Sequence, residues 1–441
     1  MNNNLGRNER PNPFAGWTNF IPESEIRRLL QYNVKYYYGG GKPGVLPLKV
    51  FSQILKDLAE KEFDQKIGTN GEAEVLDYLN YGETPGKLFL RQVLAERLRT
   101  REKLDFLDKE EGWKDIVISS GSQQACYAIL DSLLNPGDLV ITPKPAYLGF
   151  LVPVVKLGGE VVTISTDSDG IIPETLETGI NLCVRKLHKI PKAVYLVPTS
   201  DNPKGTTVPP SRRKQIYDIC TSWNILLIED NPYKEIQFNA ERGKFPGPPP
   251  IKALDTENEH VAYLCSSSKE AAVLRMGYSI LPPELREVVI KTKGFLDLCS
   301  STLSQKVLEI YYRDYFDQAL PDTIAEYKRR YEAMSKALDE SFPPGTRTHP
   351  TGGFFIWYET ENKSFDTKKF LAEKAIPNEV LYVPGHDFYP LKGHAVRAGS
   401  NQLHDNIVKT NTMRLSFSFK TPENIEEGMP ILGKLLSDVL G

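Results

Sequence analysis

The middle of the chain alternates short apolar runs with segments that are apolar at helical spacing. The apolar runs cover residues 115–119, 138–142, 194–198, 225–230 and 261–265. Helical spacing is found between them, for example at 123–134 and 212–223. A strand that is apolar at nearly every position is buried on both faces, which is typical of a parallel sheet covered by helices. We therefore expect an α/β fold with a large, mostly parallel sheet that has helices on both faces.

The last part of the chain has a different pattern. A long charged helix is expected near 318–341, followed by apolar runs at 352–358, 380–385 and 413–419 and a closing helix. This order is typical of a smaller α+β unit. We expect three segments: an N-terminal arm that completes part of the small domain, a large domain, and a C-terminal small domain. Their bounds are 1–48, 49–317 and 318–441.

Composition excludes several functional classes. The chain has 441 residues, 25% of them charged, and a net charge of −3, so neither nucleic acid nor an anionic membrane is an expected partner. No apolar run reaches the roughly 18 residues that a membrane-spanning helix needs. The five cysteines are scattered and the six histidines form no metal-binding motif. We expect a cytoplasmic protein with no metal.

Polar side chains follow three of the apolar runs. Asn202 comes shortly after 194–198, Asp230 ends 225–230, and Ser266 to Lys269 follow the last run. Ligands of such sheets bind outside the carboxyl ends of the strands. The sequence therefore predicts a site that gathers an amide, an acid and an amine.

Together with a phenol and two guanidinium groups, this set is suited to pyridoxal phosphate and an amino acid. Lys269 would attach covalently to the cofactor and then act as the general acid and base, because burial lowers the pKa of a lysine. Asp230 would pair with the pyridine nitrogen and keep it protonated. Taken alone, Asp230 is better explained as a helix N-cap.

Three further side chains could contact the ring. Tyr233 and Asn202 would approach the phenolic oxygen of the cofactor, and Tyr147 would stack on the pyridine. The ordinary alternatives are a turn at Asn202-Pro-Lys-Gly205 and an exposed loop tyrosine at position 147.

Anion-binding groups are also present. Ser122 and Gln123 open a helix whose free N–H groups favour a phosphate. Side chains that could add to this phosphate site are Ser266, Ser268 and Arg275. Arg414 lies within the apolar run 413–419, so it needs a partner. That partner is either the α-carboxylate of an amino acid or an internal carboxylate.

In these motifs the chain resembles the fold type I pyridoxal-phosphate aminotransferases of class I/II. It is most similar to their branch of 2-aminoadipate/kynurenine and multisubstrate enzymes. The motifs that carry the resemblance run through nearly the whole chain: Tyr38-Gly-Gly-Gly-Lys-Pro43, Leu79-Asn-Tyr-Gly-Glu-Thr-Pro-Gly86, Ser120-Gly-Ser-Gln-Gln124, Asn135-Pro-Gly-Asp138, Pro145-Ala-Tyr147, Asn202-Pro-Lys-Gly205, Glu229-Asp-Asn-Pro-Tyr233, Ser266-Ser-Ser-Lys269, Gly352-Gly-Phe-Phe355, Pro384-Gly-His-Asp-Phe388 and Asn411-Thr-Met-Arg414.

The resemblance implies further roles. Tyr81 would reach the phosphate in the site of a neighbouring subunit, which makes a homodimer the expected assembly. Gly40 or Gly41 would line the substrate pocket. Arg27 matches an N-terminal arginine that contacts a distal substrate carboxylate in some relatives, and it fits the solvated face of an amphipathic helix equally well.

The implied activity is transfer of the amino group of an L-amino acid to a 2-oxo acid, with 2-oxoglutarate as the expected acceptor, in a ping-pong cycle. The expected donors are 2-aminoadipate, glutamate, and aromatic or branched-chain amino acids.

Two positions depart from the family pattern. Lys204 replaces the usual threonine of Asn-Pro-Thr-Gly, and only six positions separate Lys269 from Arg275. The short 270–274 loop favours one alternative, a lyase that eliminates at a C–S bond on the same fold. The other alternative is a non-catalytic sensor, which would need a DNA-binding module that residues 1–37 are too short to form.

Overall fold

The computed structural model describes the chain except for residues 1–13, 20, 22–24, 240–244, 391 and 441. The first thirteen residues of the predicted N-terminal arm (1–48) therefore lie outside the described residues.

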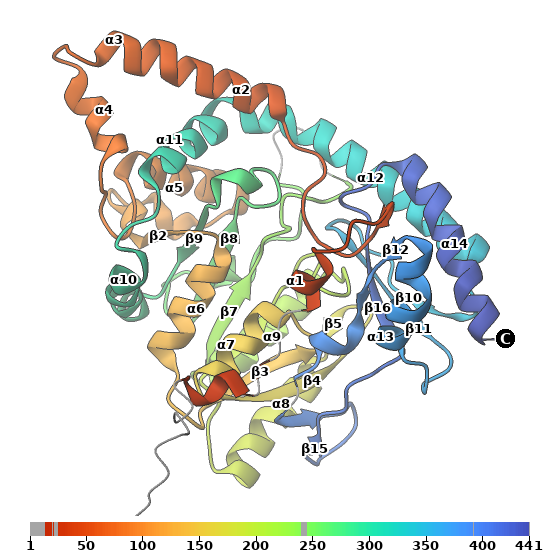
Figure 1. The fold of residues 1–441 in the computed structure, drawn as a ribbon. Coiled ribbons are helices and arrows are strands. Elements are labelled where there is room, and N and C mark those ends of the chain that lie inside the picture. The colour runs from red at the N-terminus through yellow and green to blue at the C-terminus, as the bar shows by residue number, and fades with distance from the viewer. Residues whose placement is uncertain (1–13, 20, 22–24, 240–244, 391, 441) are drawn as a thin grey trace, which may run out of the picture.

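A large mixed sheet forms the centre of the molecule (Figure 1). Its strands, in spatial order, are β15 (His404–Asp405), β14 (His394–Val396), β4 (Glu160–Asp167), β3 (Leu139–Lys144), β6 (Ala193–Leu196), β7 (Leu226–Asp230), β8 (Val261–Ser266), β9 (Gly277–Ile280) and β2 (Ile116–Ser119), with β5 (Gly170–Ile171) paired to β4. Neighbours from β14 to β8 are parallel, whereas β9 pairs antiparallel with both β8 and β2. The predicted α/β class and the mostly parallel sheet are confirmed.

Alternate residues of each central strand enter two different cores. In β3, Val140 belongs to the core that contains Phe150, whereas Ile141 belongs to the core that contains Leu176 and Ile216. The helices that supply these cores are α6 (Ser122–Leu133), α7 (Leu148–Lys156), α8 (Pro173–Leu182) and α9 (Pro210–Ser222). Because α6 and α7 cover one face and α8 and α9 the other, every central strand position can be apolar.

A smaller antiparallel sheet packs beside the large one. Its strands, in spatial order, are β10 (Gly345–Arg347), β11 (Phe355–Thr360), β16 (Thr412–Ser416) and β13 (Val383–Pro384). The long helices α12 (Phe316–Ser341) and α14 (Pro422–Leu440) share an apolar core with it. β1 (Tyr36–Tyr37) pairs with β12 (Val380–Leu381), which links the N-terminal segment to this unit.

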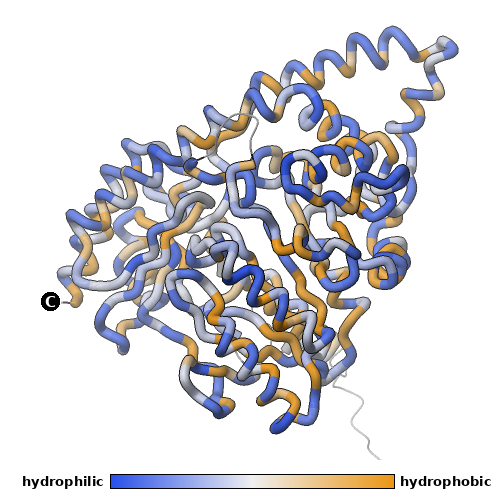
Figure 2. The backbone as a smooth tube through the Cα atoms, turned by 180° about the vertical axis from the view of Figure 1, so that it is seen from behind, coloured by the Kyte–Doolittle hydropathy of each residue, from blue (hydrophilic) through white to orange (hydrophobic). Residues whose placement is uncertain are grey.

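The remaining helices lie mainly along the outer edges (Figure 1). Their bounds are α1 (Glu25–Leu29), α2 (Leu48–Asp57), α3 (Asp64–Lys66), α4 (Glu72–Leu79), α5 (Leu88–Glu102), α10 (Pro283–Asp297), α11 (Thr302–Ile310) and α13 (Thr367–Phe370). Seen from behind, the long helices along the top edge alternate between hydrophilic and hydrophobic residues (Figure 2), as expected where one face is covered. None of the helices in the described part of the chain combines the length and apolar character that crossing a bilayer requires.

One pairing was not predicted from the sequence. β14 lies far along the chain, after most of the small sheet, yet it pairs in parallel with β4 of the large sheet. The C-terminal segment therefore closes the edge of the large sheet before it returns to β16.

Candidate active site

A cavity of about 330 Å³ opens where the carboxyl ends of the central strands face the small sheet. Its walls include Leu30, Lys42 and Phe355, together with most of the residues singled out from the sequence. The predicted site residues that line it are Gly41, Ser122, Tyr147, Asn202, Asp230, Tyr233, Ser268, Lys269, Arg275 and Arg414.

Asp230 lies at the end of β7 and is 4% exposed. Its Oδ2 accepts a hydrogen bond of 2.9 Å from the Tyr195 hydroxyl, while Oδ1 is buried and has no hydrogen-bond partner among the described residues. Burial raises the pKa of Asp230 to about 6, against the opposing effects of Tyr195, Lys269 and the nearby Ser122 hydroxyl. A buried acceptor without a donor is costly, so this oxygen is suited to a ligand that brings its own N–H.

Lys269 follows β8 and its Nζ lies 5.0 Å from the centroid of the Tyr233 ring. Burial lowers the pKa of this amine to about 8, and the charges of Arg275 and Arg414 act in the same direction. The carboxylates of Asp230 and Glu270 oppose the shift. Roughly a tenth of the amine is therefore neutral at pH 7, compared with well under a thousandth for an ordinary lysine.

An anion-binding corner lies beside the amine. Ser122 begins α6, and Arg275 Nη1 donates a hydrogen bond of 3.3 Å to Ser268 Oγ. Gly121 precedes the helix at a φ of 85°, and a Cβ there would lie 3.2 Å from Arg275 Nη2. The first N–H groups of the helix and a guanidinium thus converge where a phosphate would bind.

The short loop after Lys269 does not move Arg275 away from this corner. Residues Ala272–Leu274 form a 3₁₀ turn (η7), and Arg275 follows in the left-handed region at a φ of 53°. This sharp turn brings the guanidinium to the start of α6. The short 270–274 loop was the support for the lyase alternative. Because Arg275 still lies at the start of α6, this loop no longer favours that alternative.

Arg414 is buried in the middle of β16. Its Nη1 donates to Asn202 Oδ1 at 2.7 Å and its Nη2 to the Gly39 carbonyl at 2.8 Å, while the guanidinium lies 4.1 Å from the centroid of the Phe355 ring. Burial lowers the pKa of Arg414 to about 10. Among the described residues no carboxylate lies within 4.0 Å of it, and its buried Nε has no partner. The internal salt bridge considered above is absent from this part of the chain, and a carboxylate supplied by a ligand would complete the arginine.

The aromatic walls are held by a second set of contacts. Tyr147 donates to Gln123 Oε1 at 3.0 Å, and Gln123 in turn donates to the Gly149 carbonyl at 2.6 Å. Gln123 itself is not part of the cavity wall but fixes a residue that is. Sequence reasoning missed Tyr195, which holds Asp230 and stacks on Phe150 with ring centroids 3.8 Å apart. The available signal was the polar hydroxyl of Tyr195 within the otherwise apolar strand β6, which neighbours the strand that ends at Asp230.

Besides Gln123, three predicted residues do not line the cavity. Ser266 is buried at the end of β8, where its Oγ accepts a hydrogen bond from the Ser268 N–H. Arg27 is exposed on α1, although Leu30 from the following turn reaches the cavity wall. Tyr81 is 79% exposed in the loop between α4 and α5.

The donors and acceptors of this cavity fit pyridoxal phosphate. A lysine with a lowered pKa, an acid with one free oxygen, and a phosphate-binding helix start lie around one space bounded by Tyr147 and Tyr233. The geometry thus defines the class of pyridoxal-phosphate-dependent enzymes.

Comparison with known proteins narrows this class. The family model described as aminotransferase class I and II matches residues 51–429. The aromatic-amino-acid aminotransferase 1 of Thermococcus litoralis is 34% identical over 423 residues, which are 94% of this chain and 92% of that protein. The chain belongs to the class I and II aminotransferases. It is a transaminase that depends on pyridoxal phosphate.

Solved structures agree with this assignment. The kynurenine aminotransferase of Pyrococcus horikoshii, in complex with PMP, superposes with a TM-score of 0.82 at 31% identity, covering 97% of this chain and 98% of that one. LysN, the α-aminoadipate aminotransferase of Thermus thermophilus, gives a TM-score of 0.80 at 26% identity with the same coverage. The predicted family, cofactor and enzyme class are confirmed.

Proposed function

We propose that this aminotransferase moves the amino group of 2-aminoadipate, glutamate or an aromatic amino acid to 2-oxoglutarate in a ping-pong cycle, with branched-chain amino acids as further donors. The observation that carries the proposal is Arg414, which is buried, has no carboxylate partner among the described residues, and faces the same cavity as Lys269. Every amino donor and every 2-oxo acid presents a carboxylate to that guanidinium.

The side chains around the cavity have different roles in the proposed reaction. Arg414 binds the α-carboxylate, with Asn202 fixing the plane of the guanidinium through its 2.7 Å hydrogen bond. When bound, pyridoxal phosphate supplies an electron sink that stabilises negative charge at the substrate Cα. Asp230 would accept a hydrogen bond from the protonated ring nitrogen, and the Tyr195 hydroxyl orients Asp230 by donating to its other oxygen. Lys269, whose pKa of about 8 lies close to neutral pH, would take the proton from the substrate Cα and give it to the C4′ carbon of the cofactor.

Further cofactor contacts belong to the same proposal. Ser122, Gln123, Ser266, Ser268 and Arg275 support the phosphate directly or through one another. Tyr147 stacks on the ring, and Tyr233 and Asn202 approach its oxygen. We also propose the division into 1–48, 49–317 and 318–441, and a cytoplasmic location in keeping with the five free cysteines.

Two basic residues are candidates for a second substrate carboxylate. Lys42 lines the cavity, and its Nζ lies 3.8 Å from the centroid of the Phe419 ring, with no carboxylate partner among the described residues. Arg27 is exposed on α1 and is not one of the residues that line the cavity. Leu30 and Phe355 form the apolar part of the same wall, which suits an aromatic donor. Relatives named for aromatic amino acids, kynurenine and 2-aminoadipate support this mixed preference.

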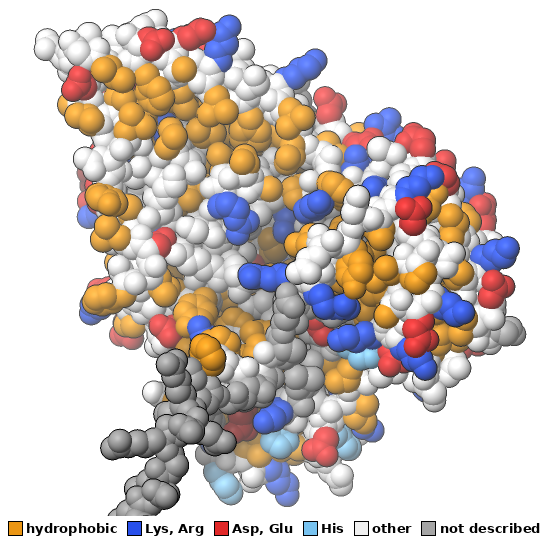
Figure 3. Space-filling view, viewed as in Figure 1, with side chains coloured by type: hydrophobic (Ala, Val, Ile, Leu, Met, Phe, Trp, Pro, Cys, Tyr) orange, Lys and Arg blue, Asp and Glu red, His pale blue; other side chains and the backbone are white. Residues whose placement is uncertain are grey.

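We further propose a homodimer in which Tyr81 completes the phosphate site of the partner. Figure 3 shows a broad apolar area over α2, α4 and α11. Exposed apolar residues in these helices and the adjoining loop are Leu48, Leu55, Leu76, Leu79, Tyr81 and Leu303. A continuous apolar surface of this kind marks an association site. Sedimentation should give a dimer, and Tyr81→Ala should weaken cofactor retention without changing the fold.

A donor panel with 2-oxoglutarate tests the substrate proposal. Lys42→Met and Arg27→Ala are compared with the wild type on glutamate, 2-aminoadipate, phenylalanine and leucine. The variant that removes the carboxylate contact should raise the KM of the acidic donors about 10- to 100-fold and leave phenylalanine nearly unchanged. Equal effects on acidic and apolar donors in both variants would contradict acid recognition by either residue.

A further inference from the structure

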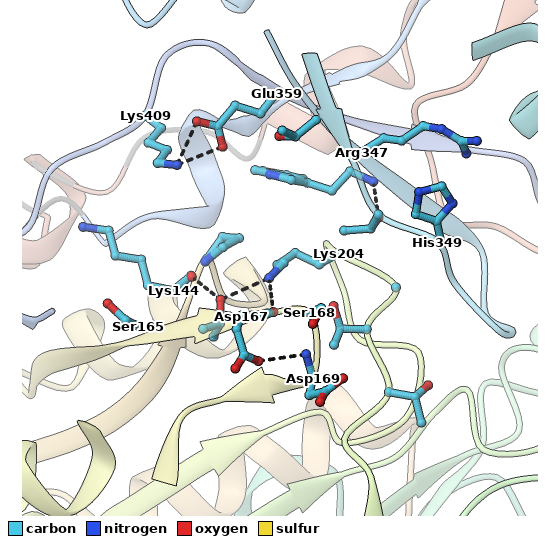
Figure 4. Close-up of a pocket in the computed structure, with 18 of the residues that line it drawn as sticks. Lys144, Ser165, Asp167, Ser168, Asp169, Lys204, Arg347, His349, Glu359 and Lys409 are labelled. Carbon is cyan, nitrogen blue, oxygen red and sulfur yellow. Dashed lines mark hydrogen bonds and ion pairs between the residues drawn. The ribbon is translucent and has the colours of Figure 1, made fainter. Parts of the chain in front are cut away.

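A second and larger cavity of about 730 Å³ lies between the large and small sheets (Figure 4). One wall comes from the ends of β3 and β4 and from the loop at 204–207; the other comes from β10, β11 and the segment before β16. We call this space the interdomain cleft. It shares no lining residue with the active-site cavity, so the transaminase site does not account for it.

The charges that line the interdomain cleft do not cancel. The basic side chains are Lys144, Lys204, Arg347, Arg397 and Lys409, and the acidic ones are Asp167, Asp169 and Glu359. Each acid already has a basic partner: Glu359 binds Lys409 at 2.8 Å, whereas Asp167 and Asp169 lie 2.5 and 3.9 Å from Arg212, which is outside the lining. Arg347 is bound by Asp339, also outside it. Among the described residues, Lys144, Lys204 and Arg397 are left without a carboxylate within 4.0 Å.

Two of these three cations are partly withdrawn from water. Lys204 Nζ donates to two neutral oxygens, Thr166 Oγ1 at 3.1 Å and the Asp167 carbonyl at 2.9 Å. Burial lowers the pKa of Lys204, although the charges of Asp201 and Asp167 oppose this shift. Burial also lowers the pKa of Lys144, and the charges of Arg397 and Lys409 lower it further. The side chains of Lys144 and Lys204 both extend into the space between the two walls (Figure 4). Cations that are partly withdrawn from water are stabilised by an anion beside them.

Neutral donors surround the cations. Hydroxyl groups on the lining come from both walls: Ser168, Thr206, Thr346 and Thr348. The hydroxyls of Ser165 and Thr166 also line the cleft, but they already donate to the carbonyls of Val396 and Lys144. A phosphate group accepts hydrogen bonds from hydroxyls and binds lysine as a point charge, so it satisfies both kinds of donor at once. The volume of the interdomain cleft exceeds that of a bare phosphate ion, so a small polar group attached to the phosphate would also fit.

We infer that the interdomain cleft binds a small phosphate-bearing metabolite through Lys144, Lys204 and Arg397. The ligand bridges the large sheet and the small sheet, because Lys144 and Lys204 lie on one wall and Thr346 and Thr348 on the other. Lys204 is two residues from Asn202, so the site adjoins the loop that orients Arg414. The inference does not depend on which amino donor the enzyme prefers.

Calorimetric titration of the cofactor-loaded enzyme with pyrophosphate tests the inference, with ionic strength held constant by sodium chloride. The wild type should show saturable binding. Lys144→Met and Lys204→Thr should each weaken it at least 10-fold, and the latter restores the residue usual in the family. Lys363→Met removes an exposed cation outside the cleft and should bind as tightly as the wild type.

Three results would overturn the inference. One is a heat signal that does not saturate; another is equal affinity in Lys144→Met, Lys204→Thr and wild type. The third is loss of binding in Arg414→Met while both cleft variants bind normally, because that pattern places the probe in the active-site cavity. Transaminase activity of the two cleft variants is measured alongside, so that unfolding is recognised as a loss of both signals.

Discussion

The active-site cavity and the interdomain cleft are both basic spaces between the same two sheets, yet they balance charge differently. The active-site cavity combines Lys269, Arg275 and Arg414 with one lining acid, Asp230, whose Oδ1 is left free. In the interdomain cleft every lining acid is already paired. The first cavity can therefore receive a ligand with both a cationic ring and anionic groups, whereas the second accepts only anions. The free oxygen of Asp230 is what allows the active-site cavity, unlike the interdomain cleft, to bind a cationic ring.

The largest contrast is expected from the same substitution in each cavity. Lys269→Ala should lower turnover by about 10⁴-fold or more and abolish the visible absorption of the lysine-bound cofactor, because it removes the amine that binds the cofactor and carries the proton. Lys144→Ala should stay within about twofold of wild type. Steady-state assays and absorption spectra measure both. Substantial turnover in Lys269→Ala would remove the basis of the active-site assignment.

Asp230 provides the next largest effect. Asp230→Asn should lower kcat by about 10²- to 10³-fold, because the ring nitrogen loses its charged partner in a dry site. Tyr195→Phe removes only one hydrogen bond to that acid and should cost roughly 1 kcal/mol, or about fivefold. If Tyr195→Phe were as damaging as Asp230→Asn, the phenol would contribute more than support of the carboxylate.

Arg414 distinguishes binding of the carboxylate from a general need for positive charge. Arg414→Lys keeps the charge but loses the planar pair of donors, and its effect should appear mainly as a rise in KM of about 10- to 100-fold for every amino donor. Initial-rate measurements with glutamate and phenylalanine separate KM from kcat. A change confined to one donor would instead assign Arg414 to the side chain of the substrate.

The pH dependence of cofactor attachment is the smallest and most specific effect. Attachment needs the neutral amine of Lys269, so its rate in cofactor-free protein should rise with pH through about 8 and then level off. Asp230 raises the pKa of Lys269, so Asp230→Asn should move the midpoint to lower pH. Stopped-flow absorption at several pH values measures the shift, and a midpoint moving upward would contradict this coupling.

Many residues that line the active-site cavity could be named from the sequence because they are tied to strand ends. Asp230, Asn202 and Lys269 follow three successive parallel strands, and parallel strands bring their carboxyl ends to one edge. Partners across the sheet were harder to find. Tyr195 reaches Asp230 because β6 and β7 pair in one particular register. The local sequence pattern of either strand does not predict that register.

The amino-acid sequence by itself determined the α/β class, the helix-covered parallel sheet and the chemical groups of the active site, since apolar periodicity and strand-end position are local properties. Only the tertiary structure decided that β14 returns to β4, that Arg414 has no carboxylate partner among the described residues, and that Lys144, Lys204 and Arg397 share one cleft. Those features depend on contacts between distant segments, and the balance of charge in a buried space is fixed only when every neighbour is in place.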